Sequence, residues 1–581
     1  MSIKAPWKSY YGNVPAHLDY PDISMYDFVE QTAQEYPNIS AYEFMGRETS
    51  YETFLKEIDE CAKALKAIGI KEEDRVTICM PNTPQGIIMF YAVNKIGALA
   101  NMIHPLSSEG EIEFFLNDSH STAALTLDAF CEKFAAVRER TGLKYLFVTS
   151  IKDKLSPVKS LGFALTKGRK IKPVPKTEGV YLWKDFLAKG KIYEGETRAE
   201  RDGGDPAVIL YSGGTTGTTK GILLSNLNFN ALSMQTAAMG DCIVPGHAML
   251  AVMPIFHGFG LGVCIHTMLT NACKCILIPQ FSAKTFGELL KKKQPNYIAG
   301  VPTLYEALLR NQAIKGIDLA CLEGVFSGGD SLSVELKRKV DAFLKEHGAT
   351  LQIREGYGTT ECVTASCLTP KNYAREGSIG IPFPDTYYKI VAPHTREELP
   401  YGQEGEICIS GPSVMLGYVG NPKETSHTLQ LHPDGAIWLH TGDLGIMDED
   451  GFIYFRQRLK RMIVSSGYSI YPSQLENIID GHEAVLMSTV IGVEDPYKMQ
   501  KVKAYVVLKP DVAPTDDIKR SVEEYCRKNI AKYAFPYEFE YRESLPQTKV
   551  GKVAFTVLEA EAREKEKMRL VQKQAQEQER L

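Results

Sequence analysis

Apolar residues in the early part of the chain follow two alternating spacings. SYETFLKEIDECAKALKAIGI (50–70) carries apolar residues at helical spacing and ends at a glycine-containing turn. DRVTICMPN (74–82) is typical of a buried strand followed by a turn, and GIIMFYAVNKIGA (86–98) of a second helix. Helices that alternate with buried strands build parallel sheets covered by helices. The pattern therefore predicts an α/β protein with largely parallel sheets.

The pattern changes near 455–461, where FRQRLKR concentrates positive charge. A shorter α/β stretch follows, with a strand-like KVKAYVVLKP (501–510) and a helix-like DDIKRSVEEYCRKNI (516–530). We therefore expect a domain boundary here. The last segment (557–581) is a charged helix former with a poor apolar stripe, which predicts a solvated or frayed helix and not a partner-binding coiled coil.

Size and composition describe a multidomain globular protein. A chain of 581 residues exceeds one ordinary core, and 44% hydrophobic with 24% charged residues is a globular composition. A formal net charge of -5 gives no electrostatic footprint for nucleic acid. The N-terminus lacks the apolar core of a signal peptide. Polar residues interrupt the apolar stretch 258–278, and this interruption favours a buried strand–helix region over a membrane span. We expect a cytoplasmic protein.

The twelve cysteines are scattered, without a CxxC pair or a Cys/His cluster at zinc spacing. Cys273 and Cys275 would share one face of a strand, where buried apolar thiols are the favoured interpretation over metal or disulfide use. Residues 152–176 form a basic, proline-bounded patch. An exposed loop is the favoured interpretation, and weak contact with an anionic membrane surface is the alternative, which would suit a lipid substrate.

A glycine- and threonine-rich loop carries the first candidate chemistry. YSGGTTGTTKG (211–221) follows the strand-like PAVILY (206–211). Its glycines let backbone N–H groups approach an anion, its threonines add hydroxyl donors, and Lys220 adds a positive charge. The combination suits a polyphosphate, although Thr219 before Lys220 excludes the Walker A pattern. A ligand-free flexible loop is the alternative.

Four later motifs add groups suited to a nucleotide. EGYGTTE (355–361) offers Tyr357 as a flat face for a purine and Glu361 as an oxygen ligand for Mg²⁺. TGDLG (441–445) presents Asp443 as an acceptor for ribose hydroxyls. RLKRMIVSSGYSIYP (458–472) begins with Arg458, whose guanidinium can donate to ribose or phosphate. LPQTKVGK (545–552) ends in Lys552 after a flexible glycine.

Taken together and in this order, the motifs resemble those of the superfamily of adenylate-forming enzymes. This superfamily includes acyl-CoA synthetases, peptide-synthetase adenylation domains and firefly luciferase, and the resemblance spans about residues 25 to 555. It implies a large N-terminal domain of packed α/β sheets (1–457), a hinge (458–460) and a small mobile α+β C-terminal domain (461–581). The active site would lie between the two domains.

The resemblance also assigns roles to residues. The phosphate loop would use Thr215, Thr216 and Lys220, and Mg²⁺ would be held by Glu361 and Thr216, with Thr360 beside Glu361. The adenine site would involve Gly328, Gly329, Asp330, Tyr357 and Gly358. Asp443 and Arg458 would bind ribose, Lys460 would be the hinge residue, and Gly467 would face the pantetheine arm of coenzyme A. Lys552 would be the mobile catalytic lysine, and His257 would stand at the mouth of the acyl pocket.

This sequence departs from the family pattern at a few positions. Thr219 stands where proline is usual, Gln457 and Arg461 stand where glycine and aspartate are frequent, and Gln547 stands where a basic residue is frequent. In the family picture none of these positions touches the reacting atoms. The departures therefore bear only on loop rigidity and on the hinge.

The implied reaction is the two-step activation of a carboxylic acid. ATP and the acid would give an acyl-adenylate and pyrophosphate, and the thiol of coenzyme A would then give the thioester and AMP. The sequence resembles bacterial fatty acyl-CoA synthetases most, which favours a medium- or long-chain fatty acid as the substrate. Alternatives are an aryl-CoA ligase, a stand-alone adenylation enzyme that loads a carrier protein, and an inert protein that only keeps the fold. A homodimer stays open.

Overall fold

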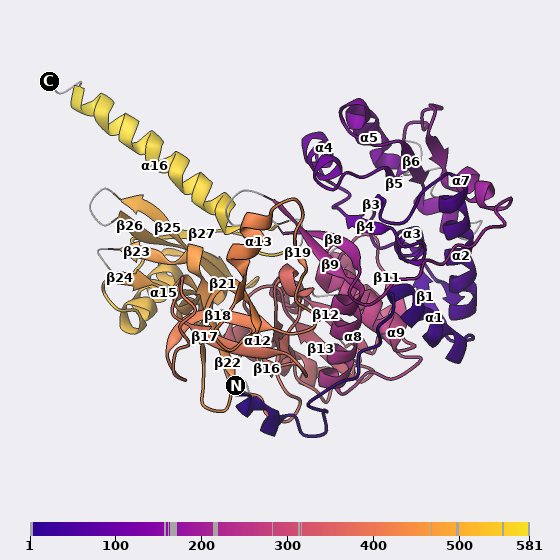
Figure 1. The fold of residues 1–581 in the computed structure, drawn as a ribbon. Coiled ribbons are helices and arrows are strands. Elements are labelled where there is room, and N and C mark those ends of the chain that lie inside the picture. The colour runs from indigo at the N-terminus through magenta and orange to yellow at the C-terminus, as the bar shows by residue number, and fades with distance from the viewer. Residues whose placement is uncertain are drawn as a thin grey trace.

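The computed structural model describes residues 4–155, 159–160, 162, 171–212, 219–281, 283–311, 314, 316–465, 468–495, 499–548 and 551–578. Within these residues the chain forms two large sheets, one smaller antiparallel sheet and a C-terminal mixed sheet. In Figure 1 most strands of the two large sheets are coloured from indigo to pink, and those of the two smaller sheets from orange to yellow.

The first large sheet has a parallel centre, as the alternating pattern predicts. Its strands β8, β4, β3, β5, β6 and β7 run parallel, and β9 and β19 extend the β8 edge antiparallel. The order is β19 (Gly417–Tyr418), β9 (Lys220–Ser225), β8 (Pro206–Ser212), β4 (Leu99–Met102), β3 (Arg75–Cys79), β5 (Ala123–Leu127), β6 (Tyr145–Thr149) and β7 (Val180–Leu182).

The second large sheet has nine strands and is parallel from β1 through β14. Its order is β16 (Ile381–Pro382), β15 (Cys367–Leu368), β14 (Arg354–Tyr357), β13 (Gly324–Ser327), β12 (Tyr297–Gly300), β10 (Ala248–Ala251), β11 (Lys274–Leu277), β1 (Ser40–Phe44) and β2 (Arg47–Ser50).

A layer of helices fills the space between the two large sheets. It consists of α1 (Met25–Glu35), α2 (Tyr51–Ala67), α3 (Pro84–Lys95), α8 (Asn226–Gly240), η6 (Phe259–His266) and α9 (Thr267–Thr270). Every residue of α3 except Lys95 is buried, so it lies at the centre of the core. The apolar stretch 258–278 is thus helix followed by strand, η6 and α9 and then β11, inside this core.

The remaining helices of this part cover the outer faces. They are α4 (Glu109–Asp118), α5 (Cys131–Val137), α7 (Trp183–Gly190), α10 (Ala283–Lys293), α11 (Pro302–Arg310), α12 (Val334–Glu346) and α13 (Pro422–Thr428). In β5 and β6, Leu125 and Phe147 face the central core, whereas Ala124 and Leu146 pack against α4 and α5. The strands are buried on both faces, which explains their nearly continuous apolar sequences.

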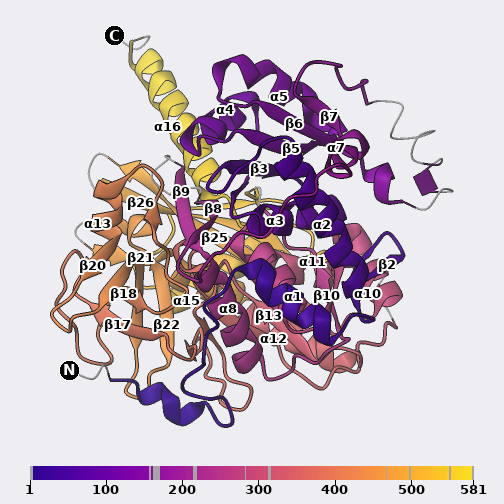
Figure 2. The same ribbon diagram turned by 45° about the vertical axis from the view of Figure 1, so that its right-hand side comes forward.

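The third sheet is antiparallel and joins the large sheets to the C-terminal part. It consists of β17 (Tyr387–Val391), β18 (Glu404–Ser410), β21 (Ile437–Met447) and β20 (Leu429–Leu431), with β22 (Ile453–Arg458) paired to β21. The N-terminal η1 (Pro6–Tyr10) packs on it through buried Trp7, whose ring meets that of Tyr387 edge-on. Figure 2 shows the N-terminus at this sheet.

The C-terminal part is a small α+β unit. Its strands are β24 (Tyr468–Ile470), β23 (Ile463–Ser465), β26 (Met499–Leu508), β25 (Val485–Asp495) and β27 (Glu538–Tyr541). The helices α14 (Pro472–Asp480) and α15 (Asp516–Asn529) cover one face, and α16 (Phe555–Gln578) begins on the other. The strand and helix expected at 501–510 and 516–530 are therefore present.

The last helix is only partly the solvated helix that we expect. Leu558 and Ala562 are buried against Tyr505 and Val507, so its first turns belong to the core. The rest of α16 projects away from the body of the protein, as Figures 1 and 2 show. The expectation of a frayed helix is wrong for the first turns, because Leu558 and Ala562, four residues apart, share one face.

All twelve cysteines are free thiols, and Cys273 and Cys275 are buried as predicted. No helix in the described residues has the length and apolarity that a bilayer-spanning segment requires. Much of the basic patch 152–176 lies outside those residues, so its contact with a membrane stays a prediction.

Candidate active site

Two parallel neighbours of the nine-stranded sheet bring the predicted adenine loops together. β13 leads into Gly328–Asp330 and β14 into Gly358–Thr360, and the two strands pair Ser327 with Glu355. Both loops therefore leave the same edge of the sheet. The packing is close at Gly358, where a β-carbon would lie 2.4 Å from the carbonyl oxygen of Thr364. Only glycine fits there.

Three polar side chains, centred on a buried carboxylate, join this edge to the third sheet. Tyr357 at the end of β14 donates its hydroxyl to Asp443 Oδ2 at 2.7 Å. Arg458 at the end of β22 lies with Nε 3.3 Å from Asp443 Oδ1, since β21 and β22 pair Asp443 with Arg458 in register. Residues from three separate motifs thus meet at one carboxylate.

The Asp443 carboxylate has unused acceptor capacity. Its side chain is 2% exposed, and Oδ1 has no hydrogen-bond partner among the described residues. Burial raises the pKa of Asp443, while the positive charge of Arg458 and the Tyr357 hydroxyl oppose this rise. A buried acceptor left unsatisfied is costly, and a ribose hydroxyl would satisfy it. The site therefore fits the nucleoside of ATP.

A second cluster gathers around Tyr418 on β19. The Tyr418 hydroxyl donates to Glu361 Oε1 at 3.0 Å. Lys220 Nζ lies 5.1 Å from the centroid of the Tyr418 ring and forms an ion pair with Glu424 on α13. Lys220 and Glu361 are therefore neighbours across one aromatic ring. The Glu361 carboxylate is an oxygen ligand that suits Mg²⁺, and Lys220 beside it is the lysine predicted to bind phosphate. The two together suit Mg²⁺ bound to phosphates.

Two residues of the predicted phosphate loop, Thr215 and Thr216, lie outside the described residues, as does Gly467. Their roles stay predictions. Lys460 lies in the short helix η9 (Leu459–Arg461), and its side chain is outside the described part.

Lys552 reaches this site from the C-terminal part on a tight turn. Two hydrogen bonds join Thr548 to Lys552. The backbone N–H of Thr548 donates to Lys552 O at 2.7 Å, and the Thr548 hydroxyl accepts from Lys552 N at 3.1 Å. A β-carbon at Gly329 would lie 3.5 Å from Lys552 Cε and 4.0 Å from Nζ. Gly329 has φ of +80°, which favours glycine at this contact.

Burial and nearby carboxylates act in opposite directions on the pKa of Lys552. Burial lowers its pKa, and the negative charges of Asp330 and Asp443 oppose this effect. The lysine also acts on His257, whose pKa falls to about 3 through burial and through the positive charge of Lys552. His257 is therefore a neutral side chain next to a cationic one.

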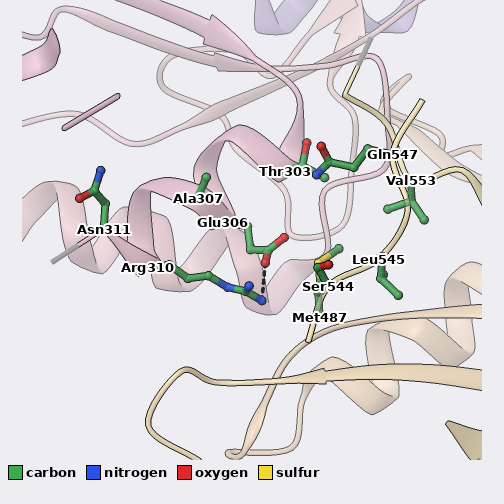
Figure 3. Close-up of a pocket in the computed structure, with 10 residues that line it drawn as sticks. All are labelled: Thr303, Glu306, Ala307, Arg310, Asn311, Met487, Ser544, Leu545, Gln547 and Val553. Atoms are coloured by element: carbon green, nitrogen blue, oxygen red, sulfur yellow. Dashed lines mark ion pairs between the residues drawn. The ribbon is translucent and has the colours of Figure 1, made fainter. Parts of the chain in front are cut away.

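Among the described residues, only a few hydrogen bonds cross the seam between the two parts, and one of them runs from the Ser473 hydroxyl to Arg456 O. Thr303 on α11 donates its hydroxyl to Gly551 O at 2.5 Å, and Lys339 Nζ on α12 donates to Val485 O at 3.2 Å. Between α11 and the segment 544–553 lies a cavity of about 370 Å³. Figure 3 shows Thr303, Glu306 and Arg310 on one wall, facing Gln547, Leu545 and Met487 on the other. A seam with such a cavity is not packed like a core.

A narrow apolar cavity of about 50 Å³ lies inside the large part, next to the loop edge. Phe259, Val263, Met249, Met268 and Leu368 line it, together with Gly328 and Gly329 from a predicted adenine loop and Gly356 from β14. Among the described residues that line it, none carries a formal charge. His257 is not among the described residues that line the cavity, although its Nδ1 accepts from the N–H of the lining residue Phe259 at 3.2 Å. The cavity is suited to the apolar chain of an acid.

The structure adds residues that the sequence did not single out. Tyr418 and Glu424 contact the predicted residues Glu361 and Lys220 directly, and Thr303 contacts Gly551, the neighbour of the predicted Lys552. Glycine before Tyr418 and proline before the helix of Glu424 are ordinary turn signals. Only the fold brings these residues to the site.

The chain belongs to the family of AMP-binding enzymes. Residues 29–419 match the family model of the AMP-binding enzyme, and residues 474–552 match that of the AMP-binding enzyme C-terminal domain. The predictions of the superfamily, of the α/β fold class and of an AMP-forming acid–thiol ligase are confirmed by the comparisons.

Curated relatives match over almost their whole length. The chain is 32% identical over 561 residues to a long-chain-fatty-acid–CoA ligase of Bacillus subtilis, with 95% of this chain and 97% of the relative covered. It is 31% identical to a long-chain-fatty-acid–CoA ligase of Salmonella typhimurium, with 97% and 99% covered.

Solved structures share the fold at lower identity. An anthranilate CoA ligase in complex with anthranoyl-AMP superposes with a TM-score of 0.80 at 22% identity, covering 95% of this chain and 99% of that one. A long-chain-fatty-acid-CoA ligase from Archaeoglobus fulgidus gives a TM-score of 0.67 at 23% identity, covering 90% and 98%.

Proposed function

We propose that this enzyme activates a medium- or long-chain fatty acid with ATP and Mg²⁺ and transfers the acyl group to coenzyme A. The observation that carries the proposal is the uncharged cavity that ends at Gly328 and Gly329, beside Lys552. Relatives at 31–32% identity that are named long-chain-fatty-acid–CoA ligases support the same substrate class. A reducing cytoplasm suits the twelve free thiols.

In the first step, the fatty carboxylate attacks the α-phosphorus of ATP and expels pyrophosphate. The carboxylate is already ionised, so no general base is needed. Its repulsion from the phosphates must be offset, and Lys552 brings a positive charge to the point where they meet. Asp443, Tyr357 and Arg458 orient the ribose. Glu361 and Thr216 would hold Mg²⁺, which would supply further positive charge to the phosphate oxygens.

In the second step, the thiol of coenzyme A attacks the acyl carbonyl and releases AMP. Lys552 occupies the approach to that carbonyl, so the C-terminal part must turn away. The chain between Arg458 and Lys460 is the connection about which it would turn. The few polar contacts and the cavity at the seam favour such a separable interface. Gly467 would then face the pantetheine arm.

A compact aromatic acid is the second candidate substrate, because the apolar cavity is narrow. At about 50 Å³ it accepts a long chain only if lining side chains move. Met249 and Met268 line it, and methionine adapts its shape readily. A long chain is therefore accommodated by rearrangement of these side chains, whereas a short acid needs less movement.

Acid-dependent exchange of labelled pyrophosphate into ATP tests the substrate class. We expect exchange with fatty acids of medium or long chain, little with benzoate-like acids, and AMP release only when coenzyme A is added. Exchange with aryl acids alone would overturn the fatty-acid assignment. Transfer to a phosphopantetheinylated carrier protein but not to coenzyme A would overturn the acceptor, and exchange with no acid would favour an inert scaffold.

Ala365→Leu gives a directed version of this test, because Ala365 lines the cavity. The larger side chain should lower kcat/KM for a long acid by a larger factor than for a short one. Val557→Leu, at an exposed position of α16, is the matched control. An equal loss for all chain lengths would show that the cavity does not hold the chain.

A further inference from the structure

A group of side chains of the kinds that bind metals lies on the third sheet, apart from the clusters of the active site. Cys408 on β18 and His440 on β21 are opposite partners in the antiparallel register, and His432 follows β20, the other neighbour of β21. One ligand atom from each of the three residues lies within 4.8 Å of the others. All three side chains are largely removed from solvent. His432 and His440 are eight residues apart and Cys408 lies further back in the chain, a spacing that matches no zinc-binding motif.

The two imidazoles point their Nε2 atoms at one another. His432 Nε2 and His440 Nε2 are 3.0 Å apart, and His440 Nδ1 lies 2.9 Å from Glu406 Oε2. A carboxylate next to Nδ1 favours the neutral tautomer with its proton on Nδ1, which leaves the Nε2 lone pair directed at His432. This is how metal-binding histidines are oriented by an outer carboxylate.

The spacing is close to that of a tetrahedral zinc site. Two nitrogens bound to zinc at about 2.0–2.1 Å lie about 3.3 Å apart, and nitrogen and a thiolate sulfur about 3.5 Å. The observed 3.0 Å between the two Nε2 atoms differs by a few tenths of an ångström. The three ligand atoms lie within 4.8 Å of one another, so side-chain rotations would bring the sulfur to its place as well.

The charges nearby also suit a divalent ion. A metal-bound thiol loses its proton, so the Cys408 thiolate and the Glu406 carboxylate together would balance two positive charges. A nearby cation, Lys389, is paired with Asp434 at 2.7 Å and lies 4.0 Å from the centroid of the Trp438 ring. Its charge is therefore already offset.

We propose that Cys408, His432 and His440 bind a transition-metal ion, with zinc as the ion that this ligand set suits best. Glu406 orients His440, and a water completes the tetrahedron. Glu406 Oε1 also accepts from Gly442 N at 2.9 Å, directly before Asp443. This site is separate from the proposed magnesium site. It would hold β21 in place, the strand that carries the ribose-binding carboxylate of Asp443.

Metal analysis of the full-length enzyme, purified without an affinity tag, tests the proposal. We expect about one equivalent of zinc by mass spectrometry, or its uptake after chelator treatment and dialysis. Cobalt added to the stripped enzyme should give a thiolate-to-metal absorption band together with tetrahedral d–d bands. Cys408→Ser should lose the charge-transfer band, and His432→Gln should weaken binding at least tenfold. Cys526→Ser, a buried thiol of the C-terminal part, should keep both.

Thermal unfolding of the wild-type enzyme keeps the proposal falsifiable if the variants fold poorly. Zinc should raise Tm in a concentration-dependent way, because it binds the folded state. The proposal is overturned if cobalt gives no charge-transfer band and zinc leaves Tm unchanged. It is equally overturned if the band survives in Cys408→Ser. The cluster would then be a hydrogen-bonded His–His–Glu network only.

Discussion

At the scale of single residues, the site depends on charges that the fold keeps from water. Asp443 is buried, accepts from Tyr357 and lies beside Arg458, so it is ready to receive a further donor. Lys552 is the opposite case, because it is a cation that reaches the same site from the C-terminal part. These two residues allow the two halves of the reaction to be separated experimentally.

Lys552→Ala should slow adenylation selectively. Loss of one preorganised positive donor costs about 2–4 kcal/mol of transition-state stabilisation, which is about 30-fold to 1000-fold in rate. Pyrophosphate exchange measures this step, and thioester formation from supplied acyl-AMP measures the other, which should be nearly unchanged. Lys565→Ala, a largely exposed lysine of α16, is the control. An equal loss in both half-reactions would contradict the role of Lys552.

Asp443→Asn should weaken ATP binding. The change removes the charge opposite Arg458 and one acceptor, and a hydrogen bond to a charged group contributes about 1.5–3 kcal/mol. The KM for ATP should rise about tenfold to a hundredfold, while the KM for the acid should change little. Tyr357→Phe removes only the partner hydroxyl and should have a smaller effect. A larger change for the acid than for ATP would refute the assignment to ribose.

At the scale of elements, the packing of α14 against α12 buries an unusual carboxylate. Asp480 at the end of α14 is buried, and its Oδ1 has no hydrogen-bond partner among the described residues. Burial raises its pKa to about 8, and the positive charge of Lys339 on α12 opposes the rise. The folded state therefore holds a proton here that the unfolded chain has lost.

Stability should consequently fall as the pH rises toward 8. For a carboxyl whose pKa is raised on folding, the stabilisation is complete below its unfolded pKa of about 4 and is lost as pH passes through the folded value. Between pH 6 and pH 8 the loss is at most about 1.4 kcal/mol per pH unit. Asp480→Asn should flatten the dependence of Tm on pH.

The exposed Asp517 offers the matched control for this measurement. Asp517→Asn should keep the wild-type slope of Tm against pH. If Asp480→Asn had the same slope as the wild type, the carboxylate would be ionised in the folded protein, and the pH dependence would come from another group.

At the scale of the whole molecule, the C-terminal part is joined to the rest by one strand end and a loosely packed seam. Its own core holds the first turns of α16, where Leu558 is fully buried, whereas Met568 is 65% exposed. The helix thus has an anchored beginning and a free-standing remainder, as seen in both ribbon views.

Two changes in α16 should therefore have different effects. Leu558→Ala should destabilise the enzyme by about 2–5 kcal/mol, because it opens a cavity in the C-terminal core. Deletion of residues 569–581 should leave Tm and the rate of acyl-CoA formation within experimental error. Denaturant unfolding and steady-state assays measure both. A large loss on deletion would mean that the projecting helix has a partner of its own.

The sequence already contained much of the fold and of the site. Expected helices and strands at 50–70, 74–82 and 516–530 are α2, β3 and α15, because apolar spacing and turn residues act locally. Tyr357, Asp443 and Arg458 were assigned from motifs, and they do meet. The zinc-type spacing sought along the sequence was absent, yet Cys408, His432 and His440 gather on one sheet.

The sequence by itself determined the order of elements, the family and the chemical type of each site residue, since these depend on local spacing and side-chain chemistry. Only the tertiary structure decided which side chains meet. Strand register sets Cys408 opposite His440 and Asp443 opposite Arg458, and the docking of the C-terminal part places Lys552 beside Gly329. Such contacts join residues far apart in the chain, and their geometry is fixed by backbone pairing and packing that no local pattern records.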